Sequence, residues 1–233
     1  MTVNGVWTEA RGTPRNGTVL LCNGGPGCCD YLLPVSEMLE DSYRVIRFEQ
    51  RGCGRSVKDG RYDLQATLED MEAIREAYGL NKWIVGGHSW GADLALIYAL
   101  EYPQRTSALI FMGGIGVQND REWAAAYHAN KDARGETHPP MDYSPNLEVN
   151  KQCNHGRKVY IQQPRLYANL AALCCPVLLL SGGEDIRPQW PVEQLHHLLP
   201  NSVFRFLPNA GHYAWLDEPE AVRRELREFF ETI

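Results

Sequence analysis

The sequence predicts an α/β protein in which a mainly parallel sheet is flanked by helices and carries one small inserted lid. Short apolar runs alternate with longer amphipathic segments along most of the chain. Several of the short runs are apolar at every position, which is typical of parallel strands buried on both faces. One long polar interval interrupts the alternation, and this interval predicts the lid.

The predicted strands are short apolar runs rich in Val, Ile, Leu and Phe. They lie at residues 18–22, 43–48, 82–86, 107–111, 176–180 and 203–206. Apolar residues recur at helical spacing in four longer segments, which predicts helices at 63–78, 92–101, 192–199 and 219–230. Asp63 stands where the N-cap of the first helix is expected. In such a sheet, ligands bind where loops leave the carboxyl ends of the strands.

The interval from residue 116 to residue 173, called the lid segment below, is polar and irregular. It contains the breakers at 138–140 and 143–146 and aromatic-bearing helical pieces such as 122–127. A stretch of this length is too long for an ordinary connection, so we expect an inserted cap. The chain then divides into a first core part at 1–115, the lid segment at 116–173 and a second core part at 174–233.

Composition and charge describe an ordinary globular protein. The 233 residues are 44% hydrophobic and 22% charged. A formal net charge of −6 argues against nucleic acid or an anionic membrane surface as a partner, since both require a basic face. No apolar run approaches the length of a membrane span and no signal peptide is visible, so we expect a cytoplasmic protein. The seven cysteines lack the spacing of a zinc site, which predicts reduced thiols and no metal.

The strongest chemical signal is the pentapeptide GHSWG at residues 87–91. It follows a predicted strand and precedes the apolar predicted helix at 92–101, which is the context of a nucleophile elbow. A serine on such a turn exposes its hydroxyl, and the helix N-terminus favours developing negative charge. We therefore expect Ser89 to be a catalytic nucleophile.

An acid and a base follow in the order that a serine triad requires. Asp185 comes directly after the apolar predicted strand at 176–180, and His212 lies in a loop before the last predicted helix. Histidine can take the serine proton, and a carboxylate is needed to hold its tautomer and stabilise the imidazolium. Asp185 is the expected acid because its shorter side chain suits the turn, with the neighbouring Glu184 as the alternative.

Acyl transfer also needs N–H donors for the oxyanion. The glycine-rich loop at residues 23–27 follows the first predicted strand, so its backbone can curl toward the nucleophile. Pro26 has no N–H to donate. The expected oxyanion hole is therefore formed by the N–H groups of Gly25 and Trp90.

Three segments together carry a family resemblance. GGPG at 24–27, EQRGCGRS at 49–56 and GHSWGADLAL at 87–96 resemble the HGGPG, DQRGxGxS and GGSWGxxLAL motifs of the prolyl aminopeptidase (proline iminopeptidase) branch of the α/β-hydrolase superfamily. The resemblance implies an α/β-hydrolase fold, a Ser-Asp-His triad and no cofactor. It also implies a serine hydrolase that forms an acyl-enzyme from a small molecule or short peptide, such as an aminopeptidase releasing N-terminal proline.

Three departures leave other substrates open. Asn23 replaces the usual histidine, His88 is more typical of esterases, lactonases and carbon–carbon bond hydrolases, and the lid segment is shorter than the aminopeptidase cap. A hydrolase of those types is one alternative, and a hydrolase-like ligand-sensing protein is another.

Other side chains are candidates for contact with substrate. The aminopeptidase cap supplies carboxylates that hold the free amino group of the substrate. The carboxylates available in the lid segment are expected to be solvated surface charges, and they are Glu122, Glu136, Asp142 and Glu148. The aromatic residues that could line an apolar substrate pocket are Tyr31, Trp123, Tyr127 and Trp215.

Overall fold

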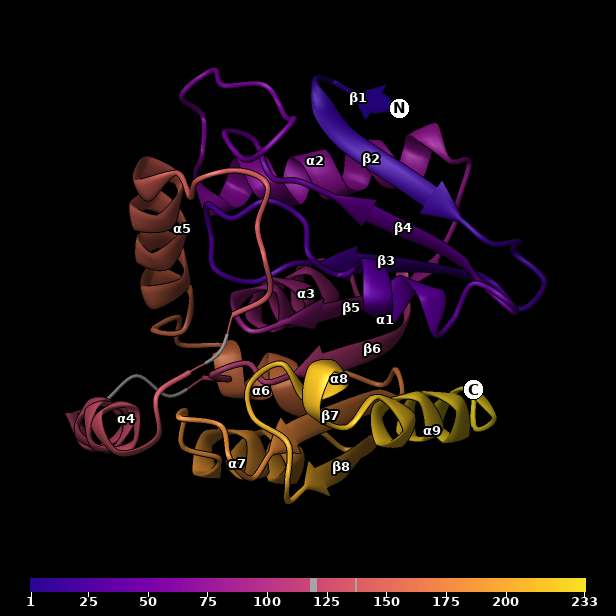
Figure 1. Ribbon diagram of the computed structural model, residues 1–233. Coiled ribbons are helices and arrows are strands. Elements are labelled where there is room, and N and C mark those ends of the chain that lie inside the picture. Colours follow the sequence, from indigo (N-terminus) through magenta and orange to yellow (C-terminus); the bar gives the residue numbers. More distant parts are fainter. Residues whose placement is uncertain (118–120, 137) are drawn as a thin grey trace.

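A mainly parallel sheet forms the centre of the protein (Figure 1). The computed structural model describes residues 1–117, 121–136 and 138–233, and within them eight strands pair in the order β1-β2-β4-β3-β5-β6-β7-β8. β1 and β2 pair antiparallel to their neighbours, and the remaining pairs are parallel. The strands span Thr2–Val3 (β1), Val6–Arg11 (β2), Thr18–Cys22 (β3), Arg44–Phe48 (β4), Trp83–His88 (β5), Thr106–Met112 (β6), Val177–Gly182 (β7) and Ser202–Leu207 (β8).

Helices cover both faces of the sheet, as the sequence predicts. One apolar cluster packs α2, α3, α5, α6 and α7 against one face, and a second packs α1, α8 and α9 against the other. In β3, Leu20 belongs to the first cluster, whereas Val19 and Leu21 belong to the second. The helices span Leu33–Glu37 (α1), Leu64–Ala77 (α2), Trp90–Glu101 (α3), Arg121–Arg134 (α4), Leu147–Tyr160 (α5), Leu166–Ala171 (α6), Trp190–Leu198 (α7), Ala214–Asp217 (α8) and Pro219–Phe230 (α9).

The predicted elements agree with the structure along the parallel core. Each of the six predicted strands overlaps one of β3 to β8, and the four predicted helices are α2, α3, α7 and α9. Asp63 is the N-cap of α2, because its carboxylate accepts the N–H of Ala66 at 2.9 Å. The α/β fold class is therefore confirmed.

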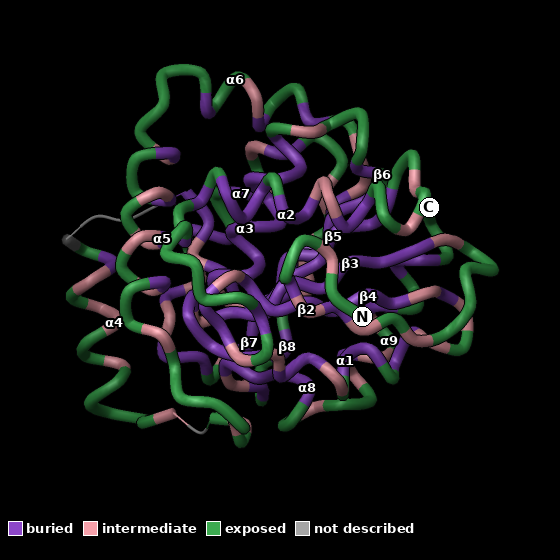
Figure 2. The backbone as a smooth tube through the Cα atoms, turned by 90° about the horizontal axis from the view of Figure 1, so that it is seen from above, coloured by how far each residue is buried: buried purple, intermediate pink, exposed green. Residues whose placement is uncertain are grey.

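The lid segment is more helical than its polar composition indicates. It lies between β6 and β7 and contains α4, α5 and α6. The expected helical piece at 122–127 lies within α4, whereas α5 and α6 are helices that the irregular pattern does not indicate. Asn146, which the sequence suggests as part of a breaker, is the N-cap of α5 and accepts the N–H groups of Glu148 and Val149. Figure 2 shows α4 largely exposed at the edge of the molecule, whereas the central strands β3 to β7 are almost entirely buried.

All seven cysteines are free thiols, five of them buried, while Cys174 is exposed and Cys175 is half-buried. In the described ranges, every helix is too short or too polar to cross a membrane.

Candidate active site

Ser89 lies on a sharp turn between β5 and α3. Its φ of 57° and ψ of −129° are unusual for a residue with a side chain, and such strain clusters at functional sites. The turn is fixed by hydrogen bonds from Ser89 N–H to the Met112 carbonyl at 2.8 Å and from Ala92 N–H to the Ser89 carbonyl at 2.9 Å. Residues 83–100 are all buried apart from Ser89, which is half-buried. The turn thus presents one hydroxyl at the carboxyl end of a central strand.

His212 and Asp185 meet at the same end of the sheet. Nδ1 of His212 lies 2.7 Å from Oδ2 of Asp185, and both side chains are almost completely buried. His212 also lies beside the elbow, since its ring centroid is 4.4 Å from that of His88. In the described part of the chain no hydrogen bond joins the His212 ring to Ser89. Such bonds often tighten only when substrate is bound.

The alternative acid, Glu184, does not pair with His212. Its side chain is 61% exposed and lies 3.6 Å from Arg134 of α4. The geometry therefore favours Asp185 as the partner of His212.

Arg187 contacts the acid directly and Glu136 contacts it through Arg187, and no sequence motif marks either position for this role. The backbone N–H of Arg187 donates to Asp185 Oδ1 at 2.8 Å, and its guanidinium donates to the same oxygen at 3.2 Å. The guanidinium also pairs with Glu136 of the lid segment. Burial alone would raise the pKa of Asp185, but His212 and Arg187 hold that pKa below its ordinary value. Asp185 is therefore held ionised, as an acid that stabilises an imidazolium must be.

The side chains around Asp185 also include the donor types that bind metal ions. Glu136, Asp185 and His212 offer ligand atoms within 4.8 Å of one another, close enough to share an ion. The guanidinium of Arg187 already donates to both carboxylates and supplies the positive charge there. The residues present therefore fit an ion-pair network better than a metal site.

The glycine-rich loop packs directly on the elbow. A Cβ on Gly24 would lie 2.5 Å from Ser89 Cβ and 2.5 Å from the His88 carbonyl oxygen, so only glycine fits there. The side-chain amide of Asn23 donates to the carbonyls of Cys28 and Cys29 at 3.1 and 3.2 Å. Asn23 therefore supports this loop, although the resembled family has histidine at this place.

The two predicted oxyanion donors lie on adjoining segments. Gly25 follows Gly24 in this loop, and Trp90 is the first residue of α3. Neither backbone N–H has a hydrogen-bond partner among the residues that the structure describes. A helix leaves its first N–H groups unpaired, which makes the Trp90 N–H available to an anion.

A chain of buried hydrogen bonds joins the glycine-rich loop to the loop that carries His212. The N–H of Gly24 donates to Tyr31 Oη at 2.7 Å, and Tyr31 lies 2.8 Å from Nδ1 of His88. Nε2 of His88 lies 2.9 Å from the His212 carbonyl, which can only accept. His88 therefore carries its proton on Nε2 and accepts from the Tyr31 hydroxyl. Burial holds the pKa of His88 well below its ordinary value, in agreement with a neutral ring.

The four aromatic candidates fall into two groups. Tyr31 and Trp215 stack with ring centroids 6.2 Å apart in the core cluster beneath the site. Trp123 and Tyr127 stack at 5.2 Å on α4, with the Arg187 guanidinium 5.9 Å from the Tyr127 ring. The contact of these rings with substrate stays a prediction.

The pH dependence of catalysis should reflect the burial of His212. Burial lowers the pKa of this ring, although Asp185 opposes the shift. A general base works only when neutral, so kcat/KM should fall as pH drops through that pKa, with a midpoint below the ordinary histidine value of about 6.5. Turnover measured from about pH 4 to 8, with tryptophan fluorescence to verify folding, tests this. A flat profile over the whole range, or a midpoint above that of free histidine, would contradict it.

The chain resembles a family profile, individual relatives in sequence, and a solved structure. The profile of the alpha/beta hydrolase fold family matches residues 17–139. A proline iminopeptidase of Xylella fastidiosa is 36% identical over 113 residues, which are 46% of this chain and 36% of that protein. The matching part therefore spans little more than a third of the length of that relative. A protein of Caulobacter segnis that bears the name of a carbamate hydrolase is 26% identical, over 99% of this chain and 98% of its own.

A solved structure extends the likeness to nearly the whole fold. A thermophilic esterase from Thermogutta terrifontis superposes with a TM-score of 0.77 and 26% identity, covering 97% of this chain and 93% of the esterase. The family profile spans more than half of the chain and includes both the glycine-rich loop and the elbow. The chain therefore belongs to the α/β-hydrolase family.

Proposed function

We propose that the protein is a serine hydrolase that cleaves small acyl substrates, esters foremost, through an acyl-enzyme on Ser89. The observation that carries the proposal is the strained, half-buried Ser89 on the elbow, next to the buried His212–Asp185 pair with its 2.7 Å hydrogen bond. Two unpaired N–H groups, those of Gly25 and Trp90, adjoin the nucleophile. These are the parts that acyl transfer requires.

The proposed mechanism assigns a role to each of these groups. Ser89 Oγ attacks the carbonyl carbon while Nε2 of His212 takes the hydroxyl proton. Asp185 accepts the Nδ1–H of His212 and stabilises the imidazolium. The N–H groups of Gly25 and Trp90 bind the oxyanion. His212 then protonates the leaving group, and a water molecule activated by His212 hydrolyses the acyl-enzyme.

The lid segment favours ester substrates over peptides with a free amine. Three of its four candidate carboxylates are exposed, as expected: Glu122, Asp142 and Glu148. Glu136 is not a solvated charge, since its side chain is 12% exposed and pairs with Arg187. A carboxylate already neutralised by a guanidinium is a poor partner for a substrate ammonium group. The esterase likeness, which extends over the lid segment, points the same way.

A second candidate is an aminopeptidase that releases an N-terminal residue such as proline. It is favoured by the 36% identity to a proline iminopeptidase, although that match covers less than half of the chain. Lactonase and carbon–carbon bond hydrolase activities are further candidates for the same triad.

A substrate panel separates these candidates. We expect multiple turnovers of p-nitrophenyl acetate and butyrate, and weak or no hydrolysis of prolyl and alanyl p-nitroanilides. γ-Butyrolactone and a vinylogous 1,5-diketone complete the panel, and each anilide is paired with its N-acetylated form. Faster hydrolysis of the free-amine anilides than of the esters would favour the aminopeptidase. Labelling by a fluorophosphonate without turnover of any substrate would favour a ligand-sensing protein.

A further inference from the structure

The lid segment holds the glycine-rich loop through two asparagines, one by its side chain and one by its backbone. Asn146, Asn150 and Asn154 are spaced four residues apart along α5 and its N-cap, so they lie on one side of the helix. The side-chain amide of Asn150 donates to the Pro26 carbonyl at 3.0 Å. The N–H of Asn146 donates to the Gly27 carbonyl at 2.8 Å. We propose that Asn150 is a positioning residue for the oxyanion hole, an inference that rests on the proposed function.

Asn150 is itself oriented by its neighbour. The side-chain amide of Asn154 donates to Oδ1 of Asn150 at 3.1 Å, which leaves the Asn150 amide N–H groups directed at the loop. The side-chain amide of Asn146 donates in turn to the Gly52 carbonyl at 3.0 Å. The fit to α5 is close, since a Cβ on Gly27 would lie 2.3 Å from the Asn146 carbonyl oxygen.

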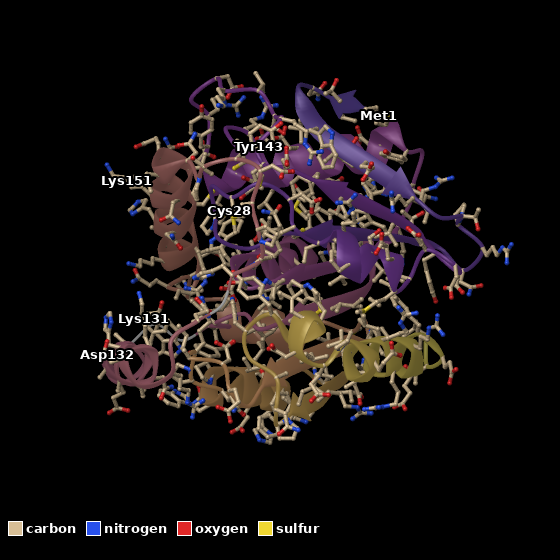
Figure 3. The ribbon with its side chains drawn as sticks, in the orientation of Figure 1. Met1, Cys28, Lys131, Asp132, Tyr143 and Lys151 are labelled. Atoms are coloured by element: carbon tan, nitrogen blue, oxygen red, sulfur yellow. The ribbon has the colours of Figure 1, made fainter. Side chains whose placement is uncertain are left out.

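α5 is a firm support for the loop because it is tied to the elbow helix. Nε of Arg157, in the last turn of α5, lies 2.8 Å from Asp93 Oδ2 of α3, and both side chains are nearly completely buried. Arg157 also donates to the Gly116 carbonyl at 2.6 Å. Asp93 lies four residues after the nucleophile, so α5 links the turn that carries Ser89 to the loop that carries Gly25. Figure 3 shows Lys151 on the outer side of α5, away from the core.

The centre of the loop needs this support because its glycines are conformationally free, whereas Asn23 holds only the end of the loop at Cys28 and Cys29. Gly25 has a φ of 55° and Gly27 a φ of 100°, and glycine backbones exchange easily between conformations. The Gly25 carbonyl accepts the N–H of Cys28 at 2.7 Å, which closes a turn with Pro26 and Gly27 at its centre. α5 and its N-cap bind the carbonyls of both central residues, and so hold the Pro26–Gly27 and Gly27–Cys28 peptides. The Pro26 ring fixes its own φ, and the Gly25 carbonyl is held by the Cys28 N–H. The turn as a whole therefore restricts the backbone of Gly25, which carries the oxyanion N–H on its preceding peptide.

The test is Asn150→Asp, which keeps the shape of the side chain but replaces the donor by an oxygen that repels the Pro26 carbonyl. An acidic residue in the first turns of a helix does not destabilise it, so the fold should persist. Complete loss of an oxyanion donor costs about 10²- to 10³-fold in kcat, and an indirect loss should cost about tenfold. We expect kcat for p-nitrophenyl acetate to fall about tenfold with KM within about twofold. Binding of phenylboronic acid, whose adduct with serine is tetrahedral, should weaken by a similar factor.

The control is Asn169→Asp, the same replacement on α6, which should leave kcat, KM and phenylboronic acid binding unchanged. Hydrogen exchange of the peptide covering residues 23–29 supplies a readout that does not depend on activity. In Asn150→Asp, exchange there should rise while the melting temperature stays within about 2 °C. If the wild-type protein shows no turnover, the proposed function fails and hydrogen exchange still decides on the role of Asn150. Unchanged exchange, or a rise in KM with kcat constant, would overturn the proposal.

Discussion

Replacing Ser89 by alanine should lower kcat for p-nitrophenyl esters by about 10⁴-fold or more, because the acyl-enzyme can no longer form. Alanine meets the same backbone cost as serine at the φ of 57°. The hydroxyl of Ser89 makes no hydrogen bond to another described residue, so its loss should leave the fold unchanged. Initial rates at saturating ester, together with circular dichroism and the melting temperature, measure both outcomes.

Ser144→Ala is the matched control for this prediction, since it removes an exposed hydroxyl from the lid segment. A fluorophosphonate probe should label the wild type and Ser144→Ala alike but not Ser89→Ala. Undiminished ester turnover in Ser89→Ala would refute the assignment of the nucleophile.

The second large effect is expected for Asp185→Asn, with a fall in kcat of about 10⁴-fold. Two donors of Arg187 face Oδ1 of Asp185, so the carbonyl oxygen of the replacing amide should take that place. The amide nitrogen would then face Nδ1 of His212 and donate to it. The ring proton would be forced onto Nε2, which could no longer accept the proton of Ser89.

Glu184→Gln is the control that the chain itself offers, as the same change at the neighbouring carboxylate. That side chain is exposed beside Arg134, so kcat should stay within about twofold of the wild type. The reverse order, a large loss in Glu184→Gln and a small one in Asp185→Asn, would exchange the roles of the two carboxylates. Equal and small losses of kcat in both variants would show that catalysis requires neither carboxylate.

The parallel core could be predicted from the sequence because its signals are local. The run at 177–180 is apolar on both faces, as a strand between two helical layers must be. β2 was missed because it lies toward the edge of the sheet and carries Glu9 and Arg11, so its pattern resembles a polar loop. α5 was missed because most of its surface is polar, and its place in the fold depends on the long-range pair between Arg157 and Asp93.

In the candidate site, too, residues with local sequence signals could be predicted, and residues that depend on long-range packing could not. Ser89, His212 and Asp185 could be proposed from motifs and chain order. The pairing of Glu136 with Arg187 could not, because it joins the lid segment to the loop after β7 and depends on how the lid packs. One local signal at the start of α5 is ambiguous, because residues 143–146 also have the composition of a helix breaker. Asn146 after Pro145 is typical of a helix start, and the repeat of asparagine at every fourth residue indicates a polar stripe on that helix.

The hydrogen bonds from α5 and its N-cap to Pro26 and Gly27 also limit which chimaeras, with the lid segment of another hydrolase, would stay active. The lid segment lies between β6 and β7, so it could be exchanged for another cap without dividing a strand of the sheet. A transplanted cap would bring its own helix against the glycine-rich loop. A chimaera whose cap lacks an amide at the place of Asn150 should bind the new substrate and turn it over slowly. Recombination should therefore preserve activity best when the glycine-rich loop and the cap are taken from the same parent.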